Sequence, residues 1–95
     1  MSEERWLKRG FRVLGRVQGV FFRAWTQETA QGLGVSGTVR NRGDGSVEAH
    51  VVGDPRAVEA FERRLWKGPP AARVDAVEVF ESEAVLPEGR FEIRY

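Results

Sequence analysis

The 95-residue sequence contains no cysteine, one histidine (His50) and one asparagine (Asn41). The absence of cysteine excludes disulfides, thiolate nucleophiles and zinc–sulfur sites, and a single histidine provides no histidine cluster for a metal. Only two of the 15 basic residues are lysine. Scarcity of Asn, Cys and Met is typical of heat-adapted, thermophilic proteins, but a GC-rich genome gives the same excess of Arg and Ala, so both explanations stay open.

The sequence also lacks the features of a membrane or secreted protein. No apolar run approaches the roughly 18 residues of a membrane span, and the first six residues do not have the basic-then-apolar order of a signal peptide. The net charge of +1 gives no general attraction to nucleic acid or to an anionic membrane. We therefore expect a cytoplasmic protein with no nucleic-acid or membrane partner. Its length predicts a single domain over residues 1–95, with its core over about 8–95.

Patterns of apolar residues predict five strands and two helices. The predicted elements are, in order, a strand over 9–17, a helix over 22–32, strands over 35–42 and 47–51, a helix over 55–67, and strands over 74–80 and 91–95. The candidate core side chains are Phe11, Val13 and Val17 on the first strand, Phe22 and Trp25 on the first helix, and Val58, Phe61 and Leu65 on the second.

Three local signals mark turns and irregularities. The stretch from Asn41 to Ser46, "NRGDGS", has the Asp-Gly chemistry of a hairpin turn. Asp54-Pro55 is typical of a helix start, with an N-cap acceptor before a proline. The apolar alternation slips between Val74 and Val77, which is compatible with a β-bulge.

The element order βαββαβ, followed by a short C-terminal fifth strand, predicts an α+β ferredoxin-like sandwich. In this fold the third strand pairs between the first and second, and both helices cover one face of an antiparallel sheet. The first and second strands then run parallel. We therefore expect the loop at residues 15–23 to lie close to Asn41, at the same end of the sheet.

The loop "GRVQGVFFR", from Gly15 to Arg23, has two interpretations. A chain that leaves a strand through glycines and enters a helix presents main-chain N–H groups to an anion, and the Arg23 guanidinium matches phosphate geometry. Any strand-to-helix turn also favours glycine, and the Walker-loop pattern is absent. The spacing by itself leaves both interpretations open.

Two motifs resemble the signatures of the acylphosphatase family. Residues 15–23 match the first, Gly-x-Val-Gln-Gly-Val-x-Phe-Arg, at every specified position. The second signature is matched by Gly37, Val39, Arg40, Asn41, Gly45, Val47 and Gly53. Thr38 departs from it, because the family usually has an aromatic residue there. The resemblance covers nearly the whole chain, including the ending "FEIRY".

The resemblance implies hydrolysis of the carboxyl–phosphate anhydride of a small-molecule acyl phosphate, with no metal and no cofactor. It implies that Arg23 and the loop main chain bind the phosphoryl group and that Asn41 positions the attacking water. The implied phosphate-binding loop consists of Arg16, Val17, Gln18, Gly19, Val20, Phe21 and Phe22. Because an acyl phosphate is already activated, positioning and charge neutralisation can supply most of the catalysis. We also expect a monomer.

Several of these residues have alternative roles. Asn41 is otherwise a turn-former before Gly43. Arg16 and Gln18 either contact substrate or stabilise the loop, and Phe21 either packs or forms a wall of the acyl pocket. We expect His50 to lie on the open face of the sheet as a surface residue.

Two other functions fit the same fold. An RNA-recognition module needs aromatic residues on its third strand, and residues 46–53 contain none. A non-catalytic anion-binding domain is the second alternative, as in the acylphosphatase-like segments of larger carbamoyl-phosphate-handling proteins. The presence of both Arg23 and Asn41, together with the short length of the chain, argues against it.

Overall fold

The structure, a computed structural model, describes residues 6–95. The elements in this part of the chain are β1 (Leu7–Arg16), α1 (Phe22–Leu33), β2 (Ser36–Asn41), β3 (Val47–Gly53), α2 (Pro55–Lys67), β4 (Arg73–Phe80) and β5 (Phe91–Arg94). The predicted order of strands and helices is confirmed. Residues 1–5, which we included in the single predicted domain, lie outside the described residues.

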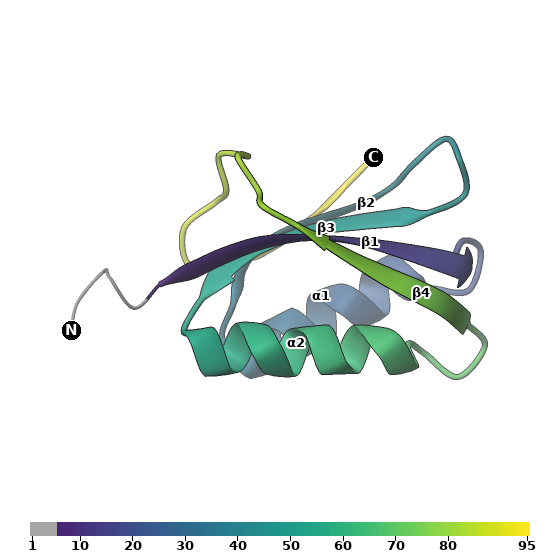
Figure 1. Cartoon of the computed structure of the whole chain (residues 1–95), viewed down its shortest axis with the longest axis horizontal. Helices are drawn as coiled ribbons and strands as arrows, with labels where there is room; N and C mark the ends of the chain where they lie inside the picture. The colour runs from purple at the N-terminus through teal and green to yellow at the C-terminus, as the bar shows by residue number, and fades with distance from the viewer. Residues whose placement is uncertain (1–5) are drawn as a thin grey trace.

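The strands form one sheet in the order β4-β1-β3-β2-β5, and both helices lie against one of its faces (Figure 1). As predicted, β3 pairs antiparallel with both β1 and β2. β5 runs parallel to β2, so the five-stranded sheet is mixed rather than entirely antiparallel. The chain after β4 stays at one end of the sheet and returns as β5, which fixes the direction of this last strand. The ferredoxin-like arrangement is confirmed.

The predicted irregularity of β4 is a register shift against β1. Leu14 lies opposite Ala76, whereas Gly15 lies opposite Val74, so Asp75 is an extra residue on β4. Gly15 has φ 129°, and a Cβ atom there would lie 2.2 Å from the carbonyl oxygen of Arg73. Glycine is therefore required where β1 passes the bulge, immediately before the loop that leads to α1.

Both helices end at glycines, and α2 begins at the start signal that the sequence predicts. Asp54 caps α2, since its Oδ1 accepts a hydrogen bond of 2.9 Å from the main-chain N–H of Arg56. α2 ends at Gly68, and α1 ends at Gly34, which is left-handed with φ 77°.

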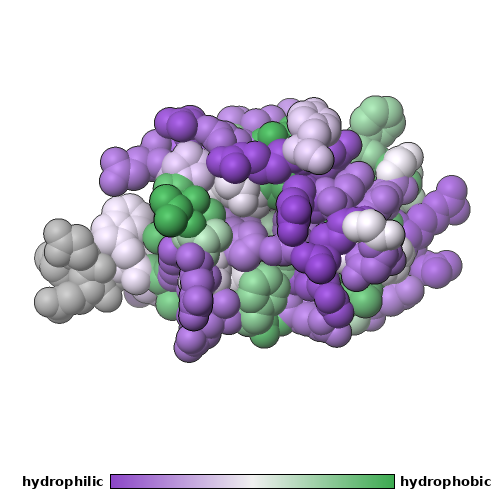
Figure 2. All heavy atoms as spheres, turned by 90° about the horizontal axis from the view of Figure 1, so that it is seen from above, coloured by the Kyte–Doolittle hydropathy of each residue, from purple (hydrophilic) through white to green (hydrophobic). Residues whose placement is uncertain are grey.

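The core lies between the helices and the sheet. Every predicted core side chain is buried except Trp25, which is partly buried and packs against the core. The opposite face of the sheet is largely hydrophilic, with apolar side chains in separate patches (Figure 2). No helix within residues 6–95 has the length and apolar character to cross a membrane.

The sheet topology brings two connections to the same end. The loop between β1 and α1 and the turn between β2 and β3 both lie at the right-hand end in Figure 1. The turn closes through hydrogen bonds from the Arg42 N–H to the Ser46 carbonyl, 2.8 Å, and from the Gly45 N–H to the Arg42 carbonyl, 3.2 Å. The hairpin predicted at 41–46 is therefore confirmed.

Candidate active site

The loop between β1 and α1 has an unusual main-chain conformation. Gly19 has φ 76°, which glycine adopts readily. Phe21 has φ 63° and ψ 28°, and it is the only non-glycine residue within 6–95 with positive φ. A bulky residue in the left-handed region costs about 1–3 kcal/mol and is found mostly at functional sites.

This conformation leaves a row of main-chain donors without protein partners. Phe21 is the N-cap residue of α1, and its side chain caps none of the free N–H groups. None of the main-chain N–H groups from Gln18 to Ala24 donates a hydrogen bond to another residue of 6–95. Such a row of donors at a helix N-terminus has the arrangement that favours an anion.

Arg23 lies in the first turn of α1 beside this row. Its guanidinium carbon is 4.6 Å from the centre of the Tyr95 ring, and its Nη1 donates a 3.5 Å hydrogen bond to the carbonyl of Arg94. None of the ion pairs found within residues 6–95 includes Arg23. Its charge is therefore free to act on a ligand.

Asn41 is the last residue of β2, and its side-chain Oδ1 is buried without a hydrogen-bond partner in the described part of the chain. The turn uses Asp44 instead, whose Oδ1 accepts hydrogen bonds from the N–H (3.0 Å) and the hydroxyl (2.6 Å) of Ser46. A side chain that formed the turn would bond to the turn. The alternative role of Asn41 as a turn-former therefore lacks the contact that it needs.

Arg23 and Asn41 line one cavity of about 360 Å³. The residues around it are Val17, Gly19, Phe21, Phe22, Arg23, Ala24, Asn41, Ile93 and Tyr95. Six of the predicted site residues thus meet at one cavity, and Arg16, Gln18 and Val20 are not among its lining residues. Arg16 is exposed at the end of β1, and Val20 is buried in the core.

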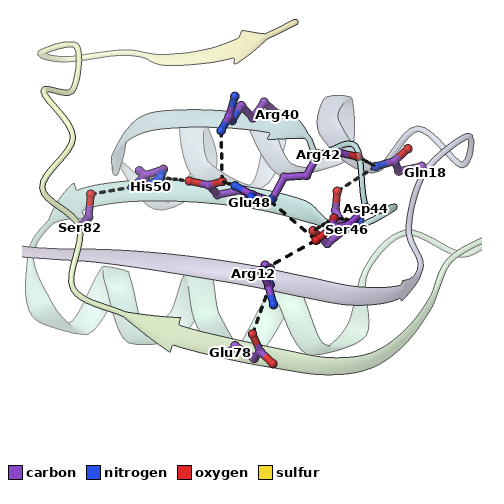
Figure 3. A network of polar contacts seen from close by, with 10 residues as sticks. All are labelled: Arg12, Gln18, Arg40, Arg42, Asp44, Ser46, Glu48, His50, Glu78 and Ser82. Carbon is purple, nitrogen blue, oxygen red and sulfur yellow. Dashed lines mark hydrogen bonds and ion pairs between the residues drawn. The ribbon is translucent and has the colours of Figure 1, made fainter.

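Gln18 connects the loop to the turn that follows Asn41 (Figure 3). Its Nε2 donates 2.8 Å hydrogen bonds to the main-chain carbonyls of Arg42 and Ser46. Both donors of the side-chain amide are thus used within the protein. The sequence left two roles open for Gln18, contact with substrate and stabilisation of the loop. Its hydrogen bonds are those of a residue that stabilises the loop.

A network of charged side chains covers the open face of the sheet next to this turn (Figure 3). Arg42 is hydrogen-bonded to Glu48, and the Nη2 of Arg40 lies 3.5 Å from the same carboxylate. Arg12, on β1, lies between the turn and β4, with its Nη1 3.8 Å from Asp44 and its Nε 3.3 Å from Glu78. The arginines of this network, unlike Arg23, are already paired with carboxylates.

The network also changes proton affinities. Burial opposes ionisation of Glu48, but hydrogen bonds from His50 and Arg42 outweigh it, so the pKa of this carboxyl is lower than its usual 4.5. The hydrogen bond to Glu48 raises the pKa of Arg42 above its usual value. Hydrogen bonds from Ser46 lower the pKa of Asp44.

His50 lies on the open face, as predicted, but only 15% of its side chain is exposed. One ring nitrogen is hydrogen-bonded to Glu48, and the other lies 2.6 Å from the Ser82 hydroxyl. The chain after β4 therefore covers His50, which the strand pattern could not predict.

Sequence reasoning missed three of the lining residues: Ala24, which follows Arg23 on α1, and the pair Ile93 and Tyr95. Ile93 and Tyr95 alternate with Arg94 at the end of the chain, and the pairing of β5 beside β2 brings them to Asn41. The only sequence signal was the match of the ending "FEIRY" to the family.

Both the sequence and the fold match those of known proteins. The acylphosphatase family profile matches residues 9–93. The chain belongs to the acylphosphatase family. It is 48% identical over 83 residues to an acylphosphatase of Rhizorhabdus wittichii, covering 87% of this chain and 84% of that relative. The family consists of hydrolases.

Solved structures support the same assignment. The structure of an acylphosphatase from Coxiella burnetii has a TM-score of 0.87 and 32% identity, covering 99% of this chain and 100% of the other. The chain also resembles a segment of HypF from T. kodakarensis, with a TM-score of 0.79 and 32% identity over 94% of this chain and 12% of HypF.

Proposed function

We propose that this member of the family hydrolyses acyl phosphates to a carboxylate and phosphate. The observation that carries the proposal is the meeting, at one cavity, of an arginine without a carboxylate partner, a row of free N–H groups and the buried, unpartnered amide oxygen of Asn41. The three features supply the positive charge, hydrogen-bond donors and a water ligand that phosphoryl transfer needs.

In the proposed mechanism the phosphoryl oxygens accept hydrogen bonds from the N–H groups of residues 18–24 and from the Arg23 guanidinium. Asn41 holds a water molecule through its side-chain amide, in line with the bond to the acyl oxygen. The water oxygen forms a bond to phosphorus, and the bond between phosphorus and the acyl oxygen breaks. The carboxylate leaves with the bonding electron pair, and the water proton passes to a phosphate oxygen.

The lining of the cavity fits a mechanism without a metal or a titrating base. Its lining includes no Asp, Glu or His, the side chains that hold divalent cations or accept protons near neutral pH. Within residues 6–95 no group of three or more such side chains is arranged around a common point. A carboxylate is a good leaving group, so the substrate phosphate can accept the water proton.

The test is phosphate release from acetyl phosphate in the presence of a chelator, with the wild-type protein and with Asn41→Ala. We expect the wild type to retain its activity with the chelator and Asn41→Ala to lose hydrolysis. Asn41→Asp is the matched control for side-chain size, and we expect it to be inactive because it cannot donate to the water oxygen. Inorganic phosphate should still bind to Asn41→Ala, as measured by calorimetry.

Three results would contradict the proposal: activity that the chelator removes, turnover of Asn41→Ala close to that of the wild type, or no hydrolysis by the wild type. Binding of phosphate without hydrolysis would favour the non-catalytic anion-binding domain, the second alternative function that fits the same fold.

A monomeric state and a cytoplasmic location are further parts of the proposal. The first is supported by the charged edge of β5, where Arg90, Glu92 and Arg94 discourage edge-to-edge pairing. Sedimentation of the purified protein at several concentrations tests it.

A further inference from the structure

A serine, a histidine and a glutamate lie in a row on the open face of the sheet (Figure 3). The hydroxyl oxygen of Ser82 lies 2.6 Å from Nδ1 of His50, and Nε2 of the same ring lies 2.5 Å from Oε2 of Glu48. None of the three lines the cavity of Arg23 and Asn41. A hydroxyl within reach of a base that a third group orients is the arrangement used in nucleophilic catalysis.

The contact with Glu48 determines which nitrogen of His50 carries the hydrogen. Burial raises the pKa of this carboxyl, but hydrogen bonds from His50 and Arg42 lower it below its usual 4.5, so the group is ionised near neutral pH. An ionised carboxylate only accepts hydrogen bonds, so Nε2 is the donor. In the neutral ring the lone pair is then on Nδ1, which faces the Ser82 hydroxyl. His50 is therefore oriented to take a proton from Ser82.

The ring of His50 is held in place, whereas the serine is reached from solvent. The ring packs edge-on against Phe80, with 5.5 Å between the ring centres, and only 15% of the His50 side chain is exposed. Ser82, in the segment that follows β4, is only partly buried. Its oxygen accepts a 3.3 Å hydrogen bond from the main-chain N–H of Ala84, a donor that also stabilises the oxygen when it loses its proton.

A second cavity, of about 520 Å³, lies on the same face of the sheet. Its apolar lining includes Trp6, Val52 and Leu86. Val52 is two residues beyond His50 on β3, so the two side chains point to the same face. Leu86 belongs to the same segment as Ser82. Apolar surface for the non-reacting part of a substrate is thus available next to the serine and the histidine.

The charges near Ser82 favour a neutral substrate. Glu81 and Glu83, on either side of Ser82, are both exposed. The charged residues in the lining of the second cavity are one of each sign, Lys8 and Glu88. Two carboxylates beside the nucleophile repel an anion such as an acyl phosphate. An uncharged carboxylic ester meets no such repulsion.

We propose that Ser82, His50 and Glu48 form a second catalytic site, which hydrolyses neutral carboxylic esters through an acyl-serine. The Ser82 oxygen forms a bond to the ester carbonyl carbon, and its proton passes to Nδ1 of His50. The bond from this carbon to the alcohol oxygen breaks, and the alcohol leaves with that proton. Water then attacks the same carbon and gives a proton to His50, which passes it to Ser82 as the carboxylic acid is released. Glu48 is a positioning residue that orients the ring and stabilises its charged form.

The test is the hydrolysis of p-nitrophenyl acetate by the wild type, Ser82→Ala and His50→Gln, measured as release of p-nitrophenol. We expect the rate above the uncatalysed reaction to fall at least about 100-fold in each variant. His50 is the only histidine of the chain, so Ser82→Ala separates attack by the serine from direct attack by an imidazole. Val85→Ala, at a 95% exposed position of the same segment, is the matched control and should keep the wild-type rate.

A covalent probe identifies the nucleophile without turnover. The wild-type protein is treated with a fluorophosphonate, which modifies activated serines, and the adduct is located by mass spectrometry. We expect one adduct, on Ser82, and none in His50→Gln. Glu48→Gln should lower kcat for the ester about 10-fold and leave KM unchanged, since KM reports the cavity rather than the orientation of the ring.

Three results would overturn the inference: no ester hydrolysis by the wild type, a rate in Ser82→Ala close to that of the wild type, or no fluorophosphonate adduct on Ser82. An unchanged kcat in Glu48→Gln would remove the positioning role of that residue. None of these results bears on hydrolysis of acyl phosphates, so the second site and the proposed function stand or fall separately.

Discussion

The side-chain amide of Gln18 lies 2.8 Å from the main-chain carbonyl oxygen of Arg42, the residue that directly follows Asn41. A second bond from the same nitrogen reaches Ser46 at 2.8 Å. The loop that would bind phosphate and the strand end that carries Asn41 are thus joined by one side chain. This link adds to the strand pairing that brings the two segments to the same end of the sheet.

Removal of the link should lower both stability and turnover. We expect Gln18→Ala to lower the free energy of unfolding by about 1–2 kcal/mol, because two part-buried carbonyls lose a donor. For a domain of this size the melting temperature falls by about 5–15 °C. Calorimetry and kcat for acetyl phosphate measure the two effects. Gln31→Ala, an exposed glutamine on α1, is the control, and a Gln18→Ala protein as stable and active as this control would contradict the role.

An ammonium group should not be able to replace the guanidinium of Arg23 in catalysis. We expect Arg23→Lys to lose at least about 100-fold in kcat/KM, because the planar fork that binds two phosphoryl oxygens is lost. The far-UV CD spectrum and the melting temperature should stay close to the wild-type values. Arg63→Lys, on the exposed side of α2, controls for the substitution itself. Turnover of Arg23→Lys within a few-fold of the wild type would remove Arg23 from the mechanism.

The pairing of Glu48 with Arg42 and His50 predicts a loss of stability in acid. Because the pKa of Glu48 is lower in the folded protein, its contribution is complete above about pH 4.5 and is lost as the pH falls through the folded value. Urea unfolding measures this loss from pH 6 to pH 3. The free energy of unfolding of Glu48→Gln should decrease less steeply with falling pH than that of the wild type, with slopes that differ by up to about 1.4 kcal/mol per pH unit. Glu59→Gln, an exposed residue of α2, should follow the wild type; identical slopes for all three proteins would contradict the prediction.

Two glycines should respond to alanine in opposite directions. A Cβ atom on Gly37, which has φ 152°, would lie 1.8 Å from the carbonyl oxygen of His50. We expect Gly37→Ala to lose about 4 kcal/mol or more of its free energy of unfolding. Gly32 is exposed within α1 and a Cβ there meets nothing within 4 Å, so Gly32→Ala should gain about 0.5–1 kcal/mol. Urea titrations measure both, and a loss in Gly32→Ala or a neutral Gly37→Ala would contradict the packing described.

Local sequence patterns predicted most of the fold because they report the environment of each side chain. The alternation around Phe11 and Val13 marks a strand with one buried face, and Asp54-Pro55 marks a helix start. The four residues of β5 alternate too, but alternation contains no information about the partner strand. The parallel pairing with β2 therefore became visible only in the assembled sheet.

The parts of the candidate site that are close together in the sequence were predictable. Arg23 and the loop lie in one motif, and the topology predicted that Asn41 would lie near them. The left-handed conformation of Phe21 and the placement of Tyr95 over Arg23 depend on the whole loop and on β5. The cover that Ser82 provides over His50 also depends on tertiary structure, since residues 32 apart form that contact.

The pairing of β5 with β2 also has a kinetic consequence. Gly37 lies opposite Phe91, and Arg40 lies opposite Arg94, so the cavity is completed only when segments separated by most of the chain have met. Closure of such a long loop is entropically expensive and slows folding. After dilution from denaturant, catalytic activity should therefore recover more slowly than the helical CD signal. Turnover would then report the last step of folding, the pairing of β5 with β2.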